Sequence, residues 1–226
     1  MTLLRLDGRQ FGITNNHVIE RIEEIIELSG SAHCYVGMAS IDPLRGVVDR
    51  SRDLDIAVFD LEGVDPEIIN GGAFQSEIAY LEPIAWPPSK VARDELLTIC
   101  GYPKATREHQ GADRFLFRSV SGSAVRVETL SDEQIGCRFE LDLSTVESDR
   151  PDEPFPNELG GMSGGLVMAQ RPWPGGVRLE AVAIVKEYHG NWDMCYLAPL
   201  DAVQLDGSIR AGAGEMLRET LRRQRT

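Results

Sequence analysis

Gly160-Gly161-Met162-Ser163-Gly164-Gly165 is the stretch on which the interpretation of this chain depends. A serine between glycines is either a flexible turn or a mount for a nucleophile. Gly161 lets the backbone bend so that successive N–H groups point at one spot, and Gly164 and Gly165 leave room for a substrate. Runs of small residues are mostly turns, so the stretch taken alone indicates a turn.

Two other stretches favour the nucleophile. A serine hydroxyl attacks a carbonyl when a base removes its proton, and a carboxylate holds that base in one tautomer. A strand-like run from Phe11 leads to His17, and Asp55 stands at the entrance of the strand that reaches Asp60. A base, a carboxylate and a nucleophile therefore follow one another in the order His, Asp, Ser.

Three motifs in this order resemble those of the bacterial trypsin-like serine peptidases, which have the chymotrypsin fold. The motifs are Thr14-Asn15-Asn16-His17-Val18, Asp55-Ile56-Ala57-Val58 and Gly161-Met162-Ser163-Gly164-Gly165. Gly101-Tyr102-Pro103 and the strand Ala181-Val182-Ala183-Ile184-Val185 give weaker support. The separations between the motifs leave room for the rest of one β-barrel and most of another.

The resemblance implies an all-β protein of two six-stranded Greek-key β-barrels, with a short helix after the catalytic histidine and a helix at the C-terminus. Residues 1–85 would form the first barrel half and carry His17 and Asp55. Residues 86–205 would form the second half and carry Ser163, and residues 206–226 would form the terminal helix.

The resemblance also implies the chemistry, which is that of a serine endopeptidase without a cofactor or metal. Asp55 would accept the Nδ1 hydrogen of His17, and Nε2 would take the proton of Ser163. The N–H groups of Gly161 and Ser163 would form the oxyanion hole. Met162 stands where animal relatives have the aspartate that captures a freed N-terminus, so activation by N-terminal cleavage is not supported.

The substrate-binding residues are where this chain departs from the resemblance. By position, Asn157 falls near the floor of the specificity pocket, and Val185, Lys186 and Glu187 correspond to the segment that pairs with the substrate backbone. Long charged side chains there would narrow or block the pocket. Two alternatives therefore stay open: a latent or inactive peptide-binding module, and a serine esterase, which does not need a groove for an extended peptide.

Local patterns predict several elements directly. Two strands joined by Asp7-Gly8 read as a hairpin over residues 3–14, and apolar residues at helical spacing predict a helix over Val18–Leu28. The proline-rich run 82–93 predicts a connector between two halves. Relatives have more chain before the hairpin, so either the first barrel lacks part of a strand, or the chain is a fragment or has a misassigned start.

Charge and cysteine usage limit the partners and the compartment. The 226 residues carry a formal net charge of −13, which argues against a nucleic-acid binder and favours basic peptides or proteins as substrates. The four cysteines form no CxxC pair, so we expect buried thiols in a reducing compartment. No apolar run is long enough to span a membrane, and a native start at Met1 would indicate a cytoplasmic protein, with an effector domain beyond this chain as an alternative context.

Overall fold

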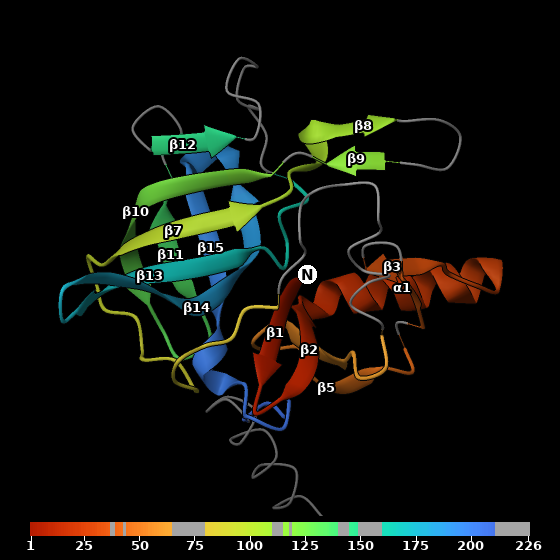
Figure 1. Ribbon diagram of the computed structural model, residues 1–226. Coiled ribbons are helices and arrows are strands. Elements are labelled where there is room, and N and C mark those ends of the chain that lie inside the picture. The colour runs from red at the N-terminus through yellow and green to blue at the C-terminus, as the bar shows by residue number, and fades with distance from the viewer. Residues whose placement is uncertain are drawn as a thin grey trace, which may run out of the picture.

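The computed structural model describes most of the chain, and every structural statement below concerns that part. The described residues are 1–36, 39–42, 44–64, 80–109, 115–117, 119–139, 145–148 and 160–210. They are mostly β-structure, with a barrel on one side and the N-terminal strands and a helix on the other (Figure 1).

Fifteen strands, one α-helix and three short 3₁₀ helices are described. The strands are β1 Thr2–Leu6, β2 Arg9–Thr14, β3 Cys34–Val36, β4 Ala39–Ile41, β5 Val47–Ser51, β6 Ile56–Asp60, β7 Leu96–Gly101, β8 Arg107–His109, β9 Phe115–Phe117, β10 Val120–Leu130, β11 Ile135–Arg138, β12 Thr145–Ser148, β13 Leu166–Trp173, β14 Gly176–His189 and β15 Met194–Pro199. The helices are α1 Asn16–Ser29, η1 Lys104–Thr106, η2 Gly190–Trp192 and η3 Leu200–Ala202.

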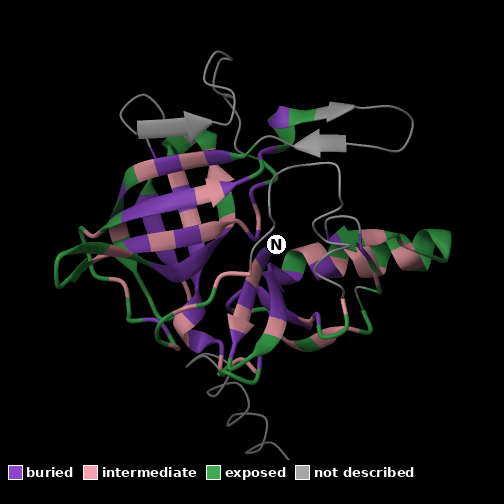
Figure 2. Cartoon of the chain, in the orientation of Figure 1, coloured by how far each residue is buried: buried purple, intermediate pink, exposed green. Residues whose placement is uncertain are grey.

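The second half of the chain closes into a six-stranded β-barrel. Its strands pair in the order β11-β15-β14-β13-β7-β10, and β10 pairs with β11 to complete the ring, while β12 adds to the free side of β10. Buried and more exposed residues alternate along the strands, as Figure 2 shows for β10 and β13. This alternation fills the interior with one set of side chains, so the expected barrel in this half is confirmed.

Two buried cysteines lie inside the barrel on neighbouring strands. Cys137 of β11 and Cys195 of β15 are directly opposite in the register. Burial raises the pKa of the Cys137 thiol to about 12 and also raises the pKa of Cys195. Both side chains therefore stay neutral and serve as packing, as expected, whereas Cys34 and Cys100, which were also expected to be buried, are only half-buried.

The first half forms a four-stranded antiparallel sheet in the order β1-β2-β6-β5. Asp7 (φ 47°) and Gly8 (φ 79°) both have left-handed backbones, which the tight turn between β1 and β2 requires, so the predicted hairpin is confirmed. β3 and β4 pair with each other in a separate two-stranded sheet. In the described part of this half the strands do not close, so the expected six-stranded first barrel is not confirmed.

The first sheet is covered on both faces. One face packs against the outside of the barrel, and the other faces α1 and the β3–β4 hairpin. β14 is likewise buried on both sides, which explains its continuous apolar run Ala181–Val185. The core shared by sheet and barrel consists of Leu4, Leu6, Phe11, Ile13, Leu54, Ile56 and Val58 from the first half, with Ala181, Ile184, Ala198, Leu200, Ala202 and Val203 from the second.

Trp86 fixes the predicted connector to the shared core. Trp86 packs against the shared core and donates a hydrogen bond from Nε1 to the Val203 carbonyl oxygen at 2.8 Å.

The two helix predictions have different outcomes. The helix expected over Val18–Leu28 is confirmed as α1. The helix expected over 206–226 does not begin at 206, because Ile209 instead forms a β-bridge with Val203. The rest of that range lies outside the described residues.

Candidate active site

Asp55 and His17 are joined by two hydrogen bonds. The Oδ2 atom of Asp55 lies 2.8 Å from Nδ1 of His17, and its Oδ1 accepts the backbone N–H of His17 at 2.9 Å. His17 is in the first turn of α1, where backbone N–H groups have no partner within the helix. The Asp55 carboxylate therefore caps the helix and orients the imidazole at the same time.

The backbone around Asp55 is shaped for this contact. Asp55 precedes β6, has a left-handed φ of 56° and is only 7% exposed. The side-chain amide of Asn15 donates to the Asp55 carbonyl oxygen at 3.1 Å. Asn15 and Asp55 thus tie the start of α1 to the start of β6, and the expected choice of Asp55 as the partner of His17 agrees with this geometry.

The environment of His17 sets both its tautomer and its proton affinity. An ionised carboxylate only accepts hydrogen bonds, so Nδ1 carries the hydrogen and Nε2 is left as the acceptor. The hydrogen bond that the Asp55 carboxylate accepts from His17 raises the pKa of His17 above its ordinary value. Partial burial opposes this, and the negative charges of Asp55 and Glu187 raise the pKa further. The positive charge of Lys186 acts in the opposite direction.

The turn that carries Ser163 is anchored in the barrel. Met162 is buried in the barrel core and holds the turn against the barrel. Gly164 donates from its N–H to the Val185 carbonyl oxygen at 2.9 Å, and Val185 donates to the Gly165 carbonyl oxygen at 2.8 Å. Val185 is itself buried, so its side chain belongs to the core, and its backbone holds the turn.

Ser163 is half-buried next to β14. Its hydroxyl donates to the carbonyl oxygen of Lys186 at 3.3 Å, and the structure gives no hydrogen bond from this hydroxyl to His17. In this arrangement the His17–Asp55 pair is assembled, whereas the nucleophile is engaged with the neighbouring strand. In unliganded enzymes the hydrogen bond between a nucleophile and its base is often long or poorly aligned and tightens only when substrate binds.

The first sheet also contacts the nucleophile turn. The hydroxyl of Thr2, which is buried, donates to the Gly164 carbonyl oxygen at 2.9 Å. Gly164 has a left-handed φ of 76°, and a Cβ at this position would lie 2.8 Å from Oγ1 of Thr14. A larger residue would therefore push the turn away from the end of β2, which leads into α1 and His17.

Gly161 also has a constrained backbone. Its φ is 94°, and a Cβ there would lie 2.9 Å from the backbone nitrogen of Lys104. Lys104 in turn donates to the Gly160 carbonyl oxygen at 2.7 Å. No described residue accepts a hydrogen bond from the N–H of Gly161 or Ser163, so both expected oxyanion donors are unused by this part of the protein.

β14 extends beyond its neighbour β13. Pairing between the two strands ends where Leu166 lies opposite Ile184, but β14 continues to His189 and stays paired with β15. Within the described ranges, no strand pairs with residues 186–189 on the β13 side. An extended chain could add there by backbone hydrogen bonds, next to Ser163.

The expected substrate-binding residues differ in their positions. Lys186 is half-buried and Glu187 is exposed on this free segment, whereas Val185 is held in the core. Asn157 lies outside the described residues. Sequence patterns gave no role to Asn15 or Thr2 and did not predict the contact of Ser163 with the Lys186 carbonyl, because these contacts join segments far apart in the chain.

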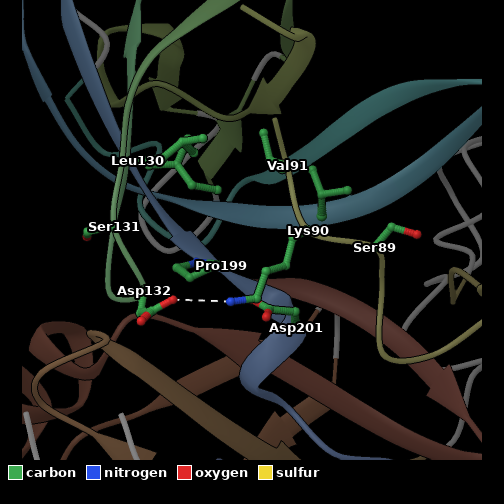
Figure 3. Close-up of a pocket in the computed structure, with 10 residues that line it drawn as sticks. Ser89, Lys90, Val91, Leu130, Ser131, Asp132, Pro199 and Asp201 are labelled. Carbon is green, nitrogen blue, oxygen red and sulfur yellow. Dashed lines mark hydrogen bonds and ion pairs between the residues drawn. The ribbon is translucent and has the colours of Figure 1, made fainter. Parts of the chain in front are cut away.

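A cavity of about 330 Å³ lies elsewhere on the barrel (Figure 3). It opens between the connector and the ends of β10 and β15, and a 3.1 Å ion pair joins Lys90 to Asp132 across it. None of its lining residues belongs to the triad. Across the described ranges, no group of three or more His, Cys, Asp or Glu side chains is placed to hold a metal ion, and no helix is long and apolar enough to cross a membrane.

A comparison of the chain with models of known protein families found no match, and neither did a comparison with curated proteins. We therefore base the function on the geometry of the site and on its three motifs.

Proposed function

We propose that this protein is a serine endopeptidase of the trypsin-like kind, with His17, Asp55 and Ser163 as its catalytic triad. The observation that carries the proposal is the pair of hydrogen bonds that the Asp55 carboxylate accepts from the ring and the backbone N–H of His17. A carboxylate that fixes the tautomer of a histidine is what general-base activation of a hydroxyl needs. The close approach of Gly164 to Thr14 supports a serine near this histidine. The proposed fold is a pair of barrels with the site between them.

The proposed reaction begins when the Ser163 hydroxyl leaves the Lys186 carbonyl and donates to Nε2 of His17. Oγ then attacks the peptide carbonyl carbon as Nε2 takes the proton, and Asp55 stabilises the resulting imidazolium. The N–H groups of Gly161 and Ser163 would bind the oxyanion. His17 gives its proton to the leaving amine, and water then hydrolyses the acyl-enzyme with His17 again acting as the base.

The free edge of β14 favours a peptide as the substrate. Residues 186–189 offer backbone N–H and C=O groups to an added strand, and the Lys186 carbonyl lies beside Ser163. A small ester would not use this row of groups. An extended peptide that pairs with the edge would be aligned with one carbonyl at the nucleophile.

The test is digestion of an unbiased mixture of peptides, read by mass spectrometry, with wild type and the Ser163→Ala variant. We expect internal cleavage by wild type and none by the variant, with both proteins equally folded by circular dichroism. Cleavage that survives the Ser163→Ala substitution would refute the assignment of the nucleophile.

One observation favours a second candidate, a latent peptide-binding module. The Ser163 hydroxyl donates to the Lys186 carbonyl, so the nucleophile and its base are not engaged in this arrangement. Peptide binding without turnover, unchanged in Ser163→Ala, would support this candidate. Turnover of esters without turnover of peptides would instead indicate a serine esterase.

A further inference from the structure

A carboxylate and a group of aromatic rings occupy the outer side of β14 just beyond Ser163. Oε2 of Glu187 lies 3.3 Å from Nε2 of His189. The His189 ring stacks on Trp192, with centroids 5.8 Å apart and planes at 24°, and meets Tyr196 edge-on at 5.5 Å. Trp192 is 69% exposed, so one side of this group is open to solvent.

These residues share one face because of the strand geometry. Glu187 and His189 are two residues apart on β14, and Glu187 lies opposite Tyr196 of β15. Tyr188, between them, packs toward the barrel core and meets Phe139 edge-on. The Glu187 side chain is half exposed, so its carboxylate remains accessible to a ligand.

The group lies within reach of the reacting atoms. The residue before Glu187 supplies the carbonyl that Ser163 contacts, and the charge of Glu187 acts on the ring of His17. If a substrate adds antiparallel to β14 with its scissile carbonyl near Lys186, the residues before the scissile bond run along Glu187 toward His189. Their side chains alternate between the two faces, so one or two would lie over this group.

A half-exposed carboxylate beside an exposed indole suits a cationic side chain. The carboxylate supplies charge and hydrogen-bond acceptors, and an aromatic face attracts a guanidinium or ammonium. Lys186 is adjacent in sequence and stands where the register of β14 against β15 shifts, and among the described residues the Glu187 carboxylate contacts His189 and makes no ion pair with Lys186.

We propose that Glu187 and Trp192 form a subsite for an arginine or lysine side chain in the residues that precede the scissile bond. This inference rests on the proposed function for its placement along the substrate. It names the substrate class as extended peptides with a basic residue shortly before the cleaved position, which also suits a chain whose net charge is −13.

The test compares peptides that differ only in the charge of one side chain before the scissile bond. Each peptide carries arginine or its neutral isostere citrulline at one of the three positions that precede the residue with the scissile carbonyl. The value of kcat/KM is measured for wild type and Glu187→Gln. We expect wild type to prefer arginine about tenfold at one of these positions, and Glu187→Gln to reduce this to about twofold. Trp192→Ala should reduce it partially.

Glu27→Gln is the matched control, because it makes the same change of charge at an exposed position on α1. It should keep the full preference for arginine. Equal rates for arginine and citrulline in wild type, or a preference that survives Glu187→Gln, would overturn the inference.

Binding measurements keep this inference separate from the proposed function. The same peptides, labelled with a fluorophore, are titrated with Ser163→Ala, and the dissociation constant is read by anisotropy. Tighter binding of the arginine peptide that is lost in Ser163→Ala/Glu187→Gln supports the subsite even if wild type cleaves nothing, in which case only the peptidase proposal fails. Equal binding of both peptides overturns the subsite even if wild type cleaves them.

Discussion

The barrel and the first sheet differ in how they obtain a core. The barrel closes on itself, and its interior is filled by side chains of its own strands. The first sheet has four strands, and one of its faces is buried by residues of β14, β15 and η3. The sheet therefore depends on the barrel for its stability, whereas the barrel interior does not depend on the sheet.

The candidate site spans both regions. Ser163 lies on a turn anchored by the barrel core, while His17 and Asp55 belong to the dependent sheet and its helix. The shared core and the Thr2–Gly164 hydrogen bond join them. Small changes at this junction should therefore affect catalysis more than they affect folding, and the variants below test that difference.

Asp55→Asn should have the largest effect. An amide in place of the carboxylate no longer fixes the tautomer of His17, so we expect kcat/KM on a cleavable peptide to fall about 10⁴-fold. Asp60→Asn is the control, because Asp60 lies at the other end of β6 and pairs with Arg9 at 2.8 Å on the surface. Normal turnover by folded Asp55→Asn would remove Asp55 from the triad.

Gly161→Val should have the second largest effect on activity. Its Cβ would meet the Lys104 backbone at 2.9 Å, so the turn must move, and loss of one oxyanion donor costs about 3 to 4 kcal/mol, or roughly 10²- to 10³-fold in kcat. Gly175→Val is the control, because Gly175 has nearly the same φ (92° against 94°) and no atom within 4 Å of its Cβ position. Equal activity of the two variants would contradict a special role for Gly161.

Leu4→Ala and Leu97→Ala compare the two cores directly. Both leucines are fully buried, Leu4 in the shared core and Leu97 in the barrel, and each truncation should cost about 2 to 5 kcal/mol of unfolding free energy. Only Leu4→Ala should also slow modification of Ser163 by a fluorophosphonate, because β1 supports the nucleophile turn. Denaturant unfolding and labelling rates measure the two effects, and equal labelling would contradict the dependence.

Thr2→Val tests the single hydrogen bond between the regions. It leaves the buried Gly164 carbonyl without its donor, at a cost of about 1 to 2 kcal/mol, and should slow labelling of Ser163 by roughly tenfold or less. Thr2→Ser keeps the hydroxyl and should restore the rate. A rate that Thr2→Ser does not restore would point to packing of the methyl group instead.

The pH dependence should show the smallest effect. The base acts when neutral, and the pKa of His17 is raised, so kcat/KM should be lost as pH falls through a value above about 6.5. Glu187→Gln removes a negative charge that raises this pKa, so the acidic limb of the pH profile should move to lower pH. Lys186→Gln removes a positive charge that lowers this pKa, so the same limb should move to higher pH. Shifts of both variants in one direction would contradict the assignment of this limb to His17.

Local patterns in the sequence were sufficient for several elements. Asp7-Gly8 predicted the hairpin, the spacing of isoleucines predicted α1, and the continuous run Ala181–Val185 marked a strand, because each signal depends on residues close together in the chain. The order of the three motifs predicted the pairing of His17 with Asp55, which the hydrogen bonds agree with.

Contacts between distant segments could not be predicted in this way. The Thr2–Gly164 and Asn15–Asp55 hydrogen bonds join residues 162 and 40 positions apart, so they depend on which surfaces meet after folding. The hydrogen bond from Ser163 to the Lys186 carbonyl depends on the course of β14 past the turn. These features decide how the site is held together, and they carry no local signal.

The most direct test of a site assembled across the two regions is intact mass after treatment with a fluorophosphonate, which reacts with activated serines. Wild type should gain one adduct, Ser163→Ala should gain none, and His17→Ala should react far more slowly while remaining folded. A well-folded wild type that gains no adduct, or a Ser163→Ala variant that still gains one, would contradict the account.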